Sequence, residues 1–267
     1  MNKQEILKQY ENEEDKLFIA KVMDKLNTVN MRNYMTSTDF LDLHQQKLAQ
    51  DFLKKQKVND YFFFGGNEYT ERKILFLFPD KLTKEIALEE AKNWIQVVRI
   101  ELPKYNNDVY THRDYLGGMI KLGIKRDKTG DIFVYPEGAD IVVQKEIAQF
   151  LQDNLSKLTR FSKSNIEVLH IKELKVPEIK YEESTIIVPT LRMDSVVSEI
   201  LRISRNKTSQ IIEEERIFIN FELCTNRSKI LKIGDKISIR GKGRFEIAEE
   251  LGSTKKDNIK LKILKYI

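Results

Sequence analysis

The sequence predicts an α+β fold in three parts, which we place at residues 1–79, 80–176 and 182–267. A chain of 267 residues is long enough for two or three domains. Apolar residues are spaced as in a helix near the N-terminus, and the spacing then changes to the short runs typical of strands. After Pro79 the predicted strands are separated by predicted helices, and this order is typical of α+β domains.

The N-terminal part is predicted to hold two helices and a β-hairpin. The second helix is expected to start from caps at Thr38 and Asp39 and to end near Lys57. The aromatic run Tyr61–Phe64 and the run Ile74–Phe78 are predicted to pair as strands. These aromatic side chains are candidates for stacking on bases, although a run of Phe in a short strand usually belongs to a core.

The middle part is predicted to be a small sandwich of the split βαβ, or ferredoxin-like, kind. Helices are expected at 82–93, 112–122 and 145–158, and strands at 95–102, 131–135, 140–143 and 166–171. This order fits the ferredoxin-like arrangement. The same fold serves many functions, so it identifies none. Residues 172–183 are predicted to be a linker or an edge connection.

Composition narrows the class of protein. Hydrophobic residues make up 41% of the chain and charged residues 33%, which is typical of a globular protein. The net charge is +5, with 46 basic residues against 41 acidic ones, so any surface for a polyanion must be a local patch. The single cysteine, Cys224, excludes an intrachain disulfide and a cysteine zinc cluster. No apolar run is long enough to span a bilayer, and we expect a cytoplasmic monomer without a cofactor.

The C-terminal part carries the clearest pattern. An amphipathic helix is expected from Met193 with Asp194 as its cap, and a second helix is expected at Lys207–Glu214 after a turn. Ser204 is predicted to be its N-cap, so we expect the first N–H groups of that helix to face outward and form a ready phosphate site. Strands are expected at 217–220 and 236–240, the latter being the last of the chain.

These segments, taken in order, resemble the alpha-L RNA-binding motif. The resemblance lies in Arg192-Met193-Asp194, Ser204-Arg205-Asn206-Lys207, residues 211–220 and residues 232–241. The motif occurs in ribosomal small-subunit protein four, tyrosyl-tRNA synthetases and pseudouridine synthases. The resemblance implies a helix pair that sits against folded RNA. Glu215 and Phe221 depart from the motif, because the family usually has Gly at both positions.

The resemblance and the charge pattern together give the candidate contacts. The residues expected to bind RNA are Arg192, Ser204, Arg205, Asn206, Lys207, Arg216, Arg240, Lys242 and Arg244. The alternative for Arg192 is a surface ion pair, and the alternative for the glycine-spaced residues 240–244 is an ordinary solvated turn. A second contact is expected from Arg113, Lys121, Lys125 and Arg126, with a solvated basic loop as the equal alternative.

Over most of its length the chain resembles the YlmH family of bacterial proteins. The resemblance rests on Thr38–Asp42, on Phe64-Gly65-Gly66 followed by Glu71-Arg72-Lys73, and above all on Thr111–Gly118 with Leu122–Arg126 and Gly130–Ile132. The resemblance implies a small N-terminal domain, an RNA-recognition-like (RRM-like) middle domain and a C-terminal alpha-L motif. It further implies a non-catalytic protein that binds ribosomal RNA of the large subunit, and peptidyl-tRNA as a second candidate, in the rescue of stalled ribosomes.

Two other classes of protein stay open. One is an RNA-modifying enzyme of the pseudouridine synthase or methyltransferase type. The sequence has no GxGxxG loop for a cofactor, and no Walker loop, nucleophile elbow or HExxH. Its one Arg-Met-Asp tripeptide, at Arg192, already belongs to the RNA-binding helix. The other class is a cell-division adaptor, which would show an exposed apolar groove.

Overall fold

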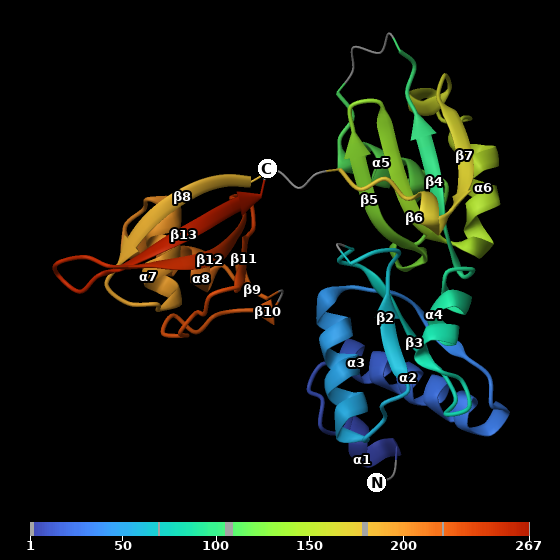
Figure 1. The fold of residues 1–267 in the computed structure, drawn as a ribbon, viewed down its shortest axis with the longest axis horizontal. Coiled ribbons are helices and arrows are strands. Elements are labelled where there is room, and N and C mark those ends of the chain that lie inside the picture. The colour runs from blue at the N-terminus through green and yellow to red at the C-terminus, as the bar shows by residue number, and fades with distance from the viewer. Residues whose placement is uncertain (1–2, 69, 105–108, 178–180, 221, 267) are drawn as a thin grey trace. The chain divides into compact units, whose positions relative to one another are not determined.

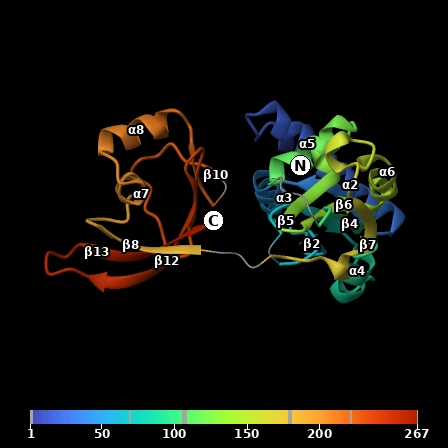
Figure 2. The ribbon, with the colours of Figure 1, turned by 90° about the horizontal axis from the view of Figure 1, so that it is seen from above.

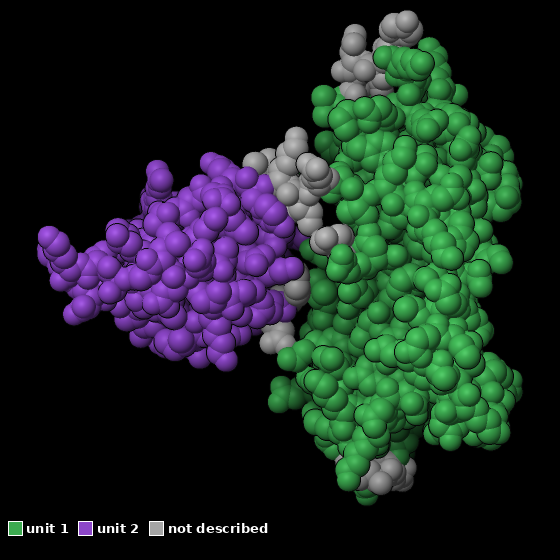
Figure 3. Space-filling model, viewed as in Figure 1, with its two compact units in different colours: residues 1–177 green, residues 178–267 purple. Residues whose placement is uncertain are grey.

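The computed structural model describes residues 3–68, 70–104, 109–177, 181–220 and 222–266. The chain forms two compact units, Met1–Pro177 and Glu178–Ile267 (Figure 3). The described residues form helices and three antiparallel sheets (Figure 1). The α+β prediction is therefore confirmed, and the segments expected as a first and a middle domain both lie in the first unit. Among these residues, none of the helices combines the length and the apolar composition that a membrane span requires.

The N-terminal half of the first unit is a three-stranded sheet with helices on one face. Its elements are α1 (Lys3–Leu7), α2 (Glu13–Arg32), β1 (Thr36–Leu41), α3 (Leu43–Lys55), β2 (Tyr61–Phe64) and β3 (Lys73–Leu77), with strand order β1-β3-β2. Helices α2 and α3 pack on this sheet through a core that includes Ile19, Phe52 and Leu75. The predicted hairpin is confirmed, since β2 and β3 pair antiparallel.

One prediction in this half is wrong. Thr38 and Asp39 were expected to cap a helix, but both lie within the strand β1. The cap of α3 is Asp42, whose carboxylate accepts a hydrogen bond from the Gln45 amide at 2.8 Å. The segment is extended because β1 pairs with β3, with Ser37 opposite Phe76 and Phe40 opposite Ile74. This long-range pairing overrides the local capping signal.

The second half of the first unit has the order β-α-β-β-α-β. Its elements are β4 (Ile95–Glu101), α5 (His112–Lys121), β5 (Thr129–Tyr135), β6 (Gly138–Gln144), α6 (Lys145–Leu155) and β7 (Asn165–His170), preceded by α4 (Lys84–Ala91). Short 3-10 turns lie at η1 (Arg126–Lys128), η2 (Thr159–Phe161) and η3 (Ile171–Glu173). The strands follow the order β5-β6-β4-β7, all antiparallel. Helices α5 and α6 cover one face through Tyr115, Met119 and Leu151.

The two sheets of the first unit share a core. Phe40, Ile74 and Phe76 of the first sheet lie in one buried cluster with Val97 and Val142 of the second. This shared cluster makes residues 1–177 a single compact unit. Within the first sheet, the Phe62 ring stacks on the Phe76 ring at 5.3 Å between centroids. The interpretation of the aromatic run as core therefore holds for this pair.

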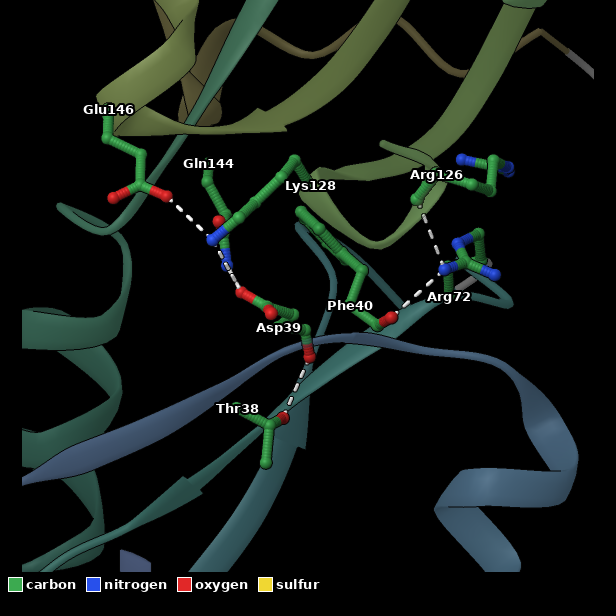
Figure 4. Close-up of polar contacts among 8 residues, drawn as sticks. All are labelled: Thr38, Asp39, Phe40, Arg72, Arg126, Lys128, Gln144 and Glu146. Atoms are coloured by element: carbon green, nitrogen blue, oxygen red, sulfur yellow. Dashed lines mark hydrogen bonds and ion pairs between the residues drawn. The ribbon is translucent and has the colours of Figure 1, made fainter. Parts of the chain in front are cut away.

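Polar contacts also join the two sheets (Figure 4). The Asp39 carboxylate accepts hydrogen bonds from the Lys128 ammonium at 2.8 Å and from the Gln144 amide at 2.9 Å. The Arg72 guanidinium donates to the Phe40 carbonyl at 2.9 Å and to the Arg126 carbonyl at 3.3 Å (Figure 4). These bonds tie β1 and the segment before β3 to the turn η1.

The second unit is a six-stranded sheet with two helices on one face (Figure 2). Its elements are β8 (Tyr181–Val188), α7 (Met193–Leu201), α8 (Arg205–Glu213), β9 (Ile217–Ile219), β10 (Glu222–Leu223), β11 (Lys236–Ile239), β12 (Gly243–Ser253) and β13 (Ile259–Tyr266). The strand order is β10-β9-β11-β12-β13-β8. Met193, Val197 and Ile212 of the helices pack on Ile237 and Ile263 of the sheet.

The predicted end of the chain is corrected here. The strand at 236–240 was expected to be the last, but β12 and β13 follow it and pair with each other along their length. Strand β8 begins inside the segment expected as a linker and pairs with β13 from Tyr181 to Val188. These strands contain no continuous apolar run, because charged residues alternate along them. In β13, for example, only Leu261 and Ile263 are buried.

Candidate nucleic-acid interface

The start of α8 presents a cluster of exposed polar and basic groups. Ser204 is the N-cap, and its hydroxyl accepts a hydrogen bond from the Lys207 amide at 3.4 Å. The predicted cap is therefore confirmed, and the helix itself begins at Arg205. Ser204, Arg205, Asn206 and Lys207 are all exposed. The Arg205 and Asn206 amides bond to no described residue, so they point N–H groups and the positive end of the helix dipole outward.

Arg192 lies at the start of α7 and is already paired. Its guanidinium donates to both carboxylate oxygens of Asp194, at 3.1 and 2.8 Å. Asp194 was expected to cap α7, but the N-cap is Arg192 and Asp194 lies in the first turn. Arg192, and to a smaller extent Arg205, hold the pKa of the Asp194 carboxyl below its ordinary value.

Two basic residues that the sequence did not single out lie beside the start of α7. The backbone carbonyl of Lys229 accepts from the Met193 amide at 2.8 Å, and that of Arg227 accepts from the Asp194 amide at 3.2 Å. The loop before β11 therefore runs beside the start of α7. Arg227 forms an ion pair with Glu213. The basic Arg227-Ser228-Lys229 triplet was the available signal, but only the fold reveals that it lies against α7.

A second basic cluster lies beyond the other end of α8. Arg216 donates to the Arg240 carbonyl at 2.6 Å and to Glu214 at 3.0 Å, so its guanidinium holds the turn after β11 in place. The Arg240 guanidinium lies over the Phe218 ring, 4.8 Å from its centroid. Gly241 and Gly243 have φ values of 75° and 117°, and between them Lys242 is exposed.

The candidate residues of the second unit therefore form two groups. Arg192 lies at the start of α7, and Ser204, Arg205, Asn206 and Lys207 lie at the start of α8. Arg216, Arg240, Lys242 and Arg244 gather near the turn after β11. Since α8 has nine residues and a helix rises 1.5 Å per residue, the two groups are separated by about 13 Å of helix.

In the first unit, the four candidate residues divide between the surface and the interior. Arg113, Lys121 and Lys125 are exposed. Arg126 instead points its Nη1 atom inward, where it donates to the carbonyls of Thr129 at 2.9 Å and Gly130 at 2.8 Å. Burial lowers the pKa of the Arg126 guanidinium to about 10, and the neighbouring Arg72 acts in the same direction. Arg126 thus organises the turn before β5, and we omit it from the candidate contacts.

Two sequence expectations concern residues with special backbone geometry. Glu215, which replaces the Gly usual in the resembling motif, has a left-handed φ of 54°. The fold therefore places a glutamate where glycine would be unstrained. Phe221, the other departure, lies outside the described residues.

Comparisons with known proteins show which proteins this chain resembles. Residues 89–176 match the family model described as "Putative RNA-binding domain in YlmH". The chain is 28% identical over 249 residues to the ribosome-associated protein quality control protein P2 of Bacillus subtilis, and the match covers 93% of this chain and 94% of that protein.

Two further similarities are looser. The chain is 25% identical over 269 residues to the periplasmic chaperone PpiD of Buchnera aphidicola, covering 86% of this chain but 41% of that protein. A solved structure described as the cell division protein ylmH from Streptococcus pneumoniae aligns with a TM-score of 0.48 and 22% identity, covering 62% of this chain and 98% of that one. The Bacillus subtilis match runs through nearly the whole of both proteins and contains the segment matched by the family model. The chain is thus similar to YlmH proteins in residues 89–176 and to a ribosome-associated quality control protein over nearly its whole length.

Proposed function

We propose that this protein is a non-catalytic RNA-binding protein that binds the large ribosomal subunit during quality control of stalled ribosomes. The observation that carries the proposal is the exposed start of α8, where Ser204, Arg205 and Lys207 surround outward-facing N–H groups. The similarity over 93% of the chain to a ribosome-associated quality control protein supports the ribosome as the place where it acts. This role assigns the protein to the cytoplasm and needs neither a catalytic residue nor a cofactor.

The start of α8 suits a phosphate group for three reasons. Unpaired N–H groups at a helix start donate to anionic oxygens, and the helix dipole adds a positive potential there. The Arg205 and Lys207 side chains add two full charges. A basic residue in the first turn of a helix opposes the dipole, so an external anion would relieve this repulsion. Contacts of this kind fix the position of a protein on RNA and read its shape, while they carry little sequence information.

The architecture supports the separate roles of the domains that the resemblance to the YlmH family implies. The helix pair α7–α8 and the strands around it agree with an alpha-L motif within residues 182–267. The β-α-β-β-α-β order and the strand order β5-β6-β4-β7 agree with an RRM-like domain within residues 80–176. We assign RNA gripping to the first of these and treat residues 1–79 as its structural support. We expect the protein to act as a monomer, with peptidyl-tRNA as an additional contact.

Co-sedimentation with separated ribosomal subunits tests this proposal. The wild-type chain should pellet with the large subunit and be released as salt rises, because phosphate contacts are screened by salt. The Arg205→Ala/Lys207→Ala variant should lose at least about tenfold in affinity, since charge-assisted contacts contribute about 1–3 kcal/mol each. Lys54→Ala/Lys55→Ala on α3 removes the same charge elsewhere and is the matched control.

Each outcome bears on a different part of the proposal. Equal pelleting of the α8 variant and the control would reject the start of α8 as the RNA grip. Failure of the wild type to pellet with either subunit would reject the ribosome as the partner.

A further inference from the structure

RRM-like sheets often bind single strands by stacking bases on aromatic residues of the open sheet face. In this chain that face is not open. Val97, Val142 and Leu169, which point away from α5 and α6, are packed against Phe40, Ile74 and Phe76 of the N-terminal sheet. The N-terminal half of the unit therefore occupies the place where stacked bases would lie.

A further part of the face is covered by the chain itself. The segment after β7 passes across the sheet (Figure 1) and is held there by two hydrogen bonds. The Arg99 guanidinium donates to the Glu173 carbonyl at 2.8 Å, and the Lys175 amide donates to the Asp140 carboxylate at 2.8 Å. The hydroxyl of Tyr135, an aromatic residue on this end of the sheet, is likewise engaged, donating to Asp140 at 2.7 Å. RNA contact by this domain must therefore use another surface.

The outer face of α5 has the charge that such a surface needs. Arg113, Gly117 and Lys121 follow one another at intervals of four residues, so they lie in one row along the helix. Lys125 follows after the turn that ends the helix. Arg113, Lys121 and Lys125 are exposed, and none of their side chains forms a hydrogen bond or ion pair with a residue that the structure describes.

The two adjacent glycines of α5 differ in their surroundings. A Cβ at Gly118 would lie 2.6 Å from Cε2 of Phe161, so packing inside the protein requires glycine there. A Cβ at Gly117 would meet no atom within 4 Å. Glycine in a helix interior destabilises the fold by about 1 kcal/mol relative to alanine, and nothing within the described residues offsets this cost at Gly117. Close approach of an external ligand to the helix backbone explains the residue.

We propose that the outer face of α5, with Gly117 at its centre and Arg113, Lys121 and Lys125 around it, binds the sugar-phosphate backbone of folded RNA. This inference rests on the proposed function, because it adds a second contact to the same RNA-binding role. The three unpaired cations supply charge complementarity to phosphates. The smooth backbone at Gly117 allows a ribose-phosphate chain to lie against the helix. This surface suits duplex or hairpin RNA and does not need unstacked bases.

The test measures binding of the full chain to a generic RNA hairpin and to a single-stranded oligouridine of equal length, by fluorescence anisotropy. Gly117→Leu should raise the melting temperature, because the new side chain enters open space and improves helix propensity. It should at the same time weaken binding to the hairpin by about tenfold, since the side chain would hold the backbone away. Gly117→Ala should raise the melting temperature at least as much, because alanine has the highest helix propensity, and should weaken hairpin binding less than Gly117→Leu. Arg113→Ala/Lys121→Ala should also weaken hairpin binding, by a similar factor.

The outcomes separate this inference from the proposed function. Weaker hairpin binding in the α5 variants, with Arg205→Ala/Lys207→Ala showing its own loss, supports both. A loss in the α5 variants alone supports this inference and rejects the grip at α8. Unchanged hairpin binding in Gly117→Leu, with a raised melting temperature, overturns the inference whatever the α8 variant does. A loss confined to oligouridine would also overturn it.

Discussion

At the scale of single residues, neighbouring basic side chains have different tasks. Lys125 is exposed, whereas the next residue, Arg126, donates to carbonyls inside the turn before β5. Arg216 similarly holds the Arg240 carbonyl, while Lys242 is exposed. Residue type alone cannot separate these tasks, because an arginine suits both phosphates and backbone carbonyls. The sequence therefore predicted where basic residues gather, but not which of their side chains are free to bind a ligand.

The Arg126→Ala variant tests the inward role of this arginine. We expect the variant to lose about 1–3 kcal/mol of unfolding free energy, because the Gly130 carbonyl would lose the Arg126 donor and the Thr129 carbonyl would keep only Arg72. Lys125→Ala should stay within about 0.5 kcal/mol of wild type, as exposed positions usually do. Denaturant unfolding of both variants measures the difference. Equal stability of the two would contradict the role assigned to Arg126.

Glu215 gives a second prediction at this scale. Its φ of 54° is strained for a residue with a side chain, so Glu215→Gly should stabilise the protein by about 0.5–1 kcal/mol. Glu214 has a right-handed φ of −76°, so Glu214→Gly should destabilise it instead. Thermal melting of the pair checks the sign of each change. A destabilised Glu215→Gly variant would show that the glutamate side chain contributes more than the strain removes.

At the scale of elements, local patterns predicted those that carry a strong local signal. The hairpin of β2 and β3, the helices α5 and α6, and the cap of α8 follow from aromatic runs, helical spacing and a capping serine. Strand β1 was mistaken for a helix start because Thr38 and Asp39 look like caps, and only pairing with β3 makes the segment extended. Strands β12 and β13 were missed because their charged residues alternate and their pairing has bulges.

The surroundings of Asp140, in the sheet β5-β6-β4-β7, predict that the stability of the fold depends on pH. Burial acts to raise the pKa of Asp140, but hydrogen bonds from Arg99, the Lys175 amide and Tyr135 outweigh it and hold the pKa below its ordinary value. A carboxylate with a lowered pKa stabilises the fold fully above its unfolded pKa of about 3.9, and this stabilisation is lost as pH falls through the folded pKa. The protein should therefore lose stability below about pH 4.

The Asp140→Asn variant isolates this contribution. Its melting temperature should be lower than wild type at pH 6, because Arg99 would lose a buried partner. The gap should narrow as pH falls from about 5 to below 3. Asp153→Asn, at an exposed position of α6, should follow the wild-type curve. A gap that stays constant over this range would show that ionised Asp140 does not stabilise the fold.

At the scale of the whole molecule, the sequence could not show that the two sheets of the first unit pack against each other. Phe40 and Phe76 are apolar whether they face a helix or a second sheet, so their pattern gives no sign of the core they share with Val97 and Val142. That shared core covers the face on which an RRM-like domain would stack bases. By our proposals, RNA recognition then depends on helix surfaces, namely the start of α8 and the outer face of α5.

The salt dependence of binding to the large ribosomal subunit tests the central claim most directly, namely that the start of α8 holds phosphates. The logarithm of the binding constant should fall linearly with the logarithm of salt concentration, and the slope reports the number of phosphate contacts. Arg205→Ala should weaken binding and reduce the magnitude of the slope by about 1, because one contact is removed. A weaker binding constant with an unchanged slope, or no change in either, would contradict a phosphate contact at Arg205.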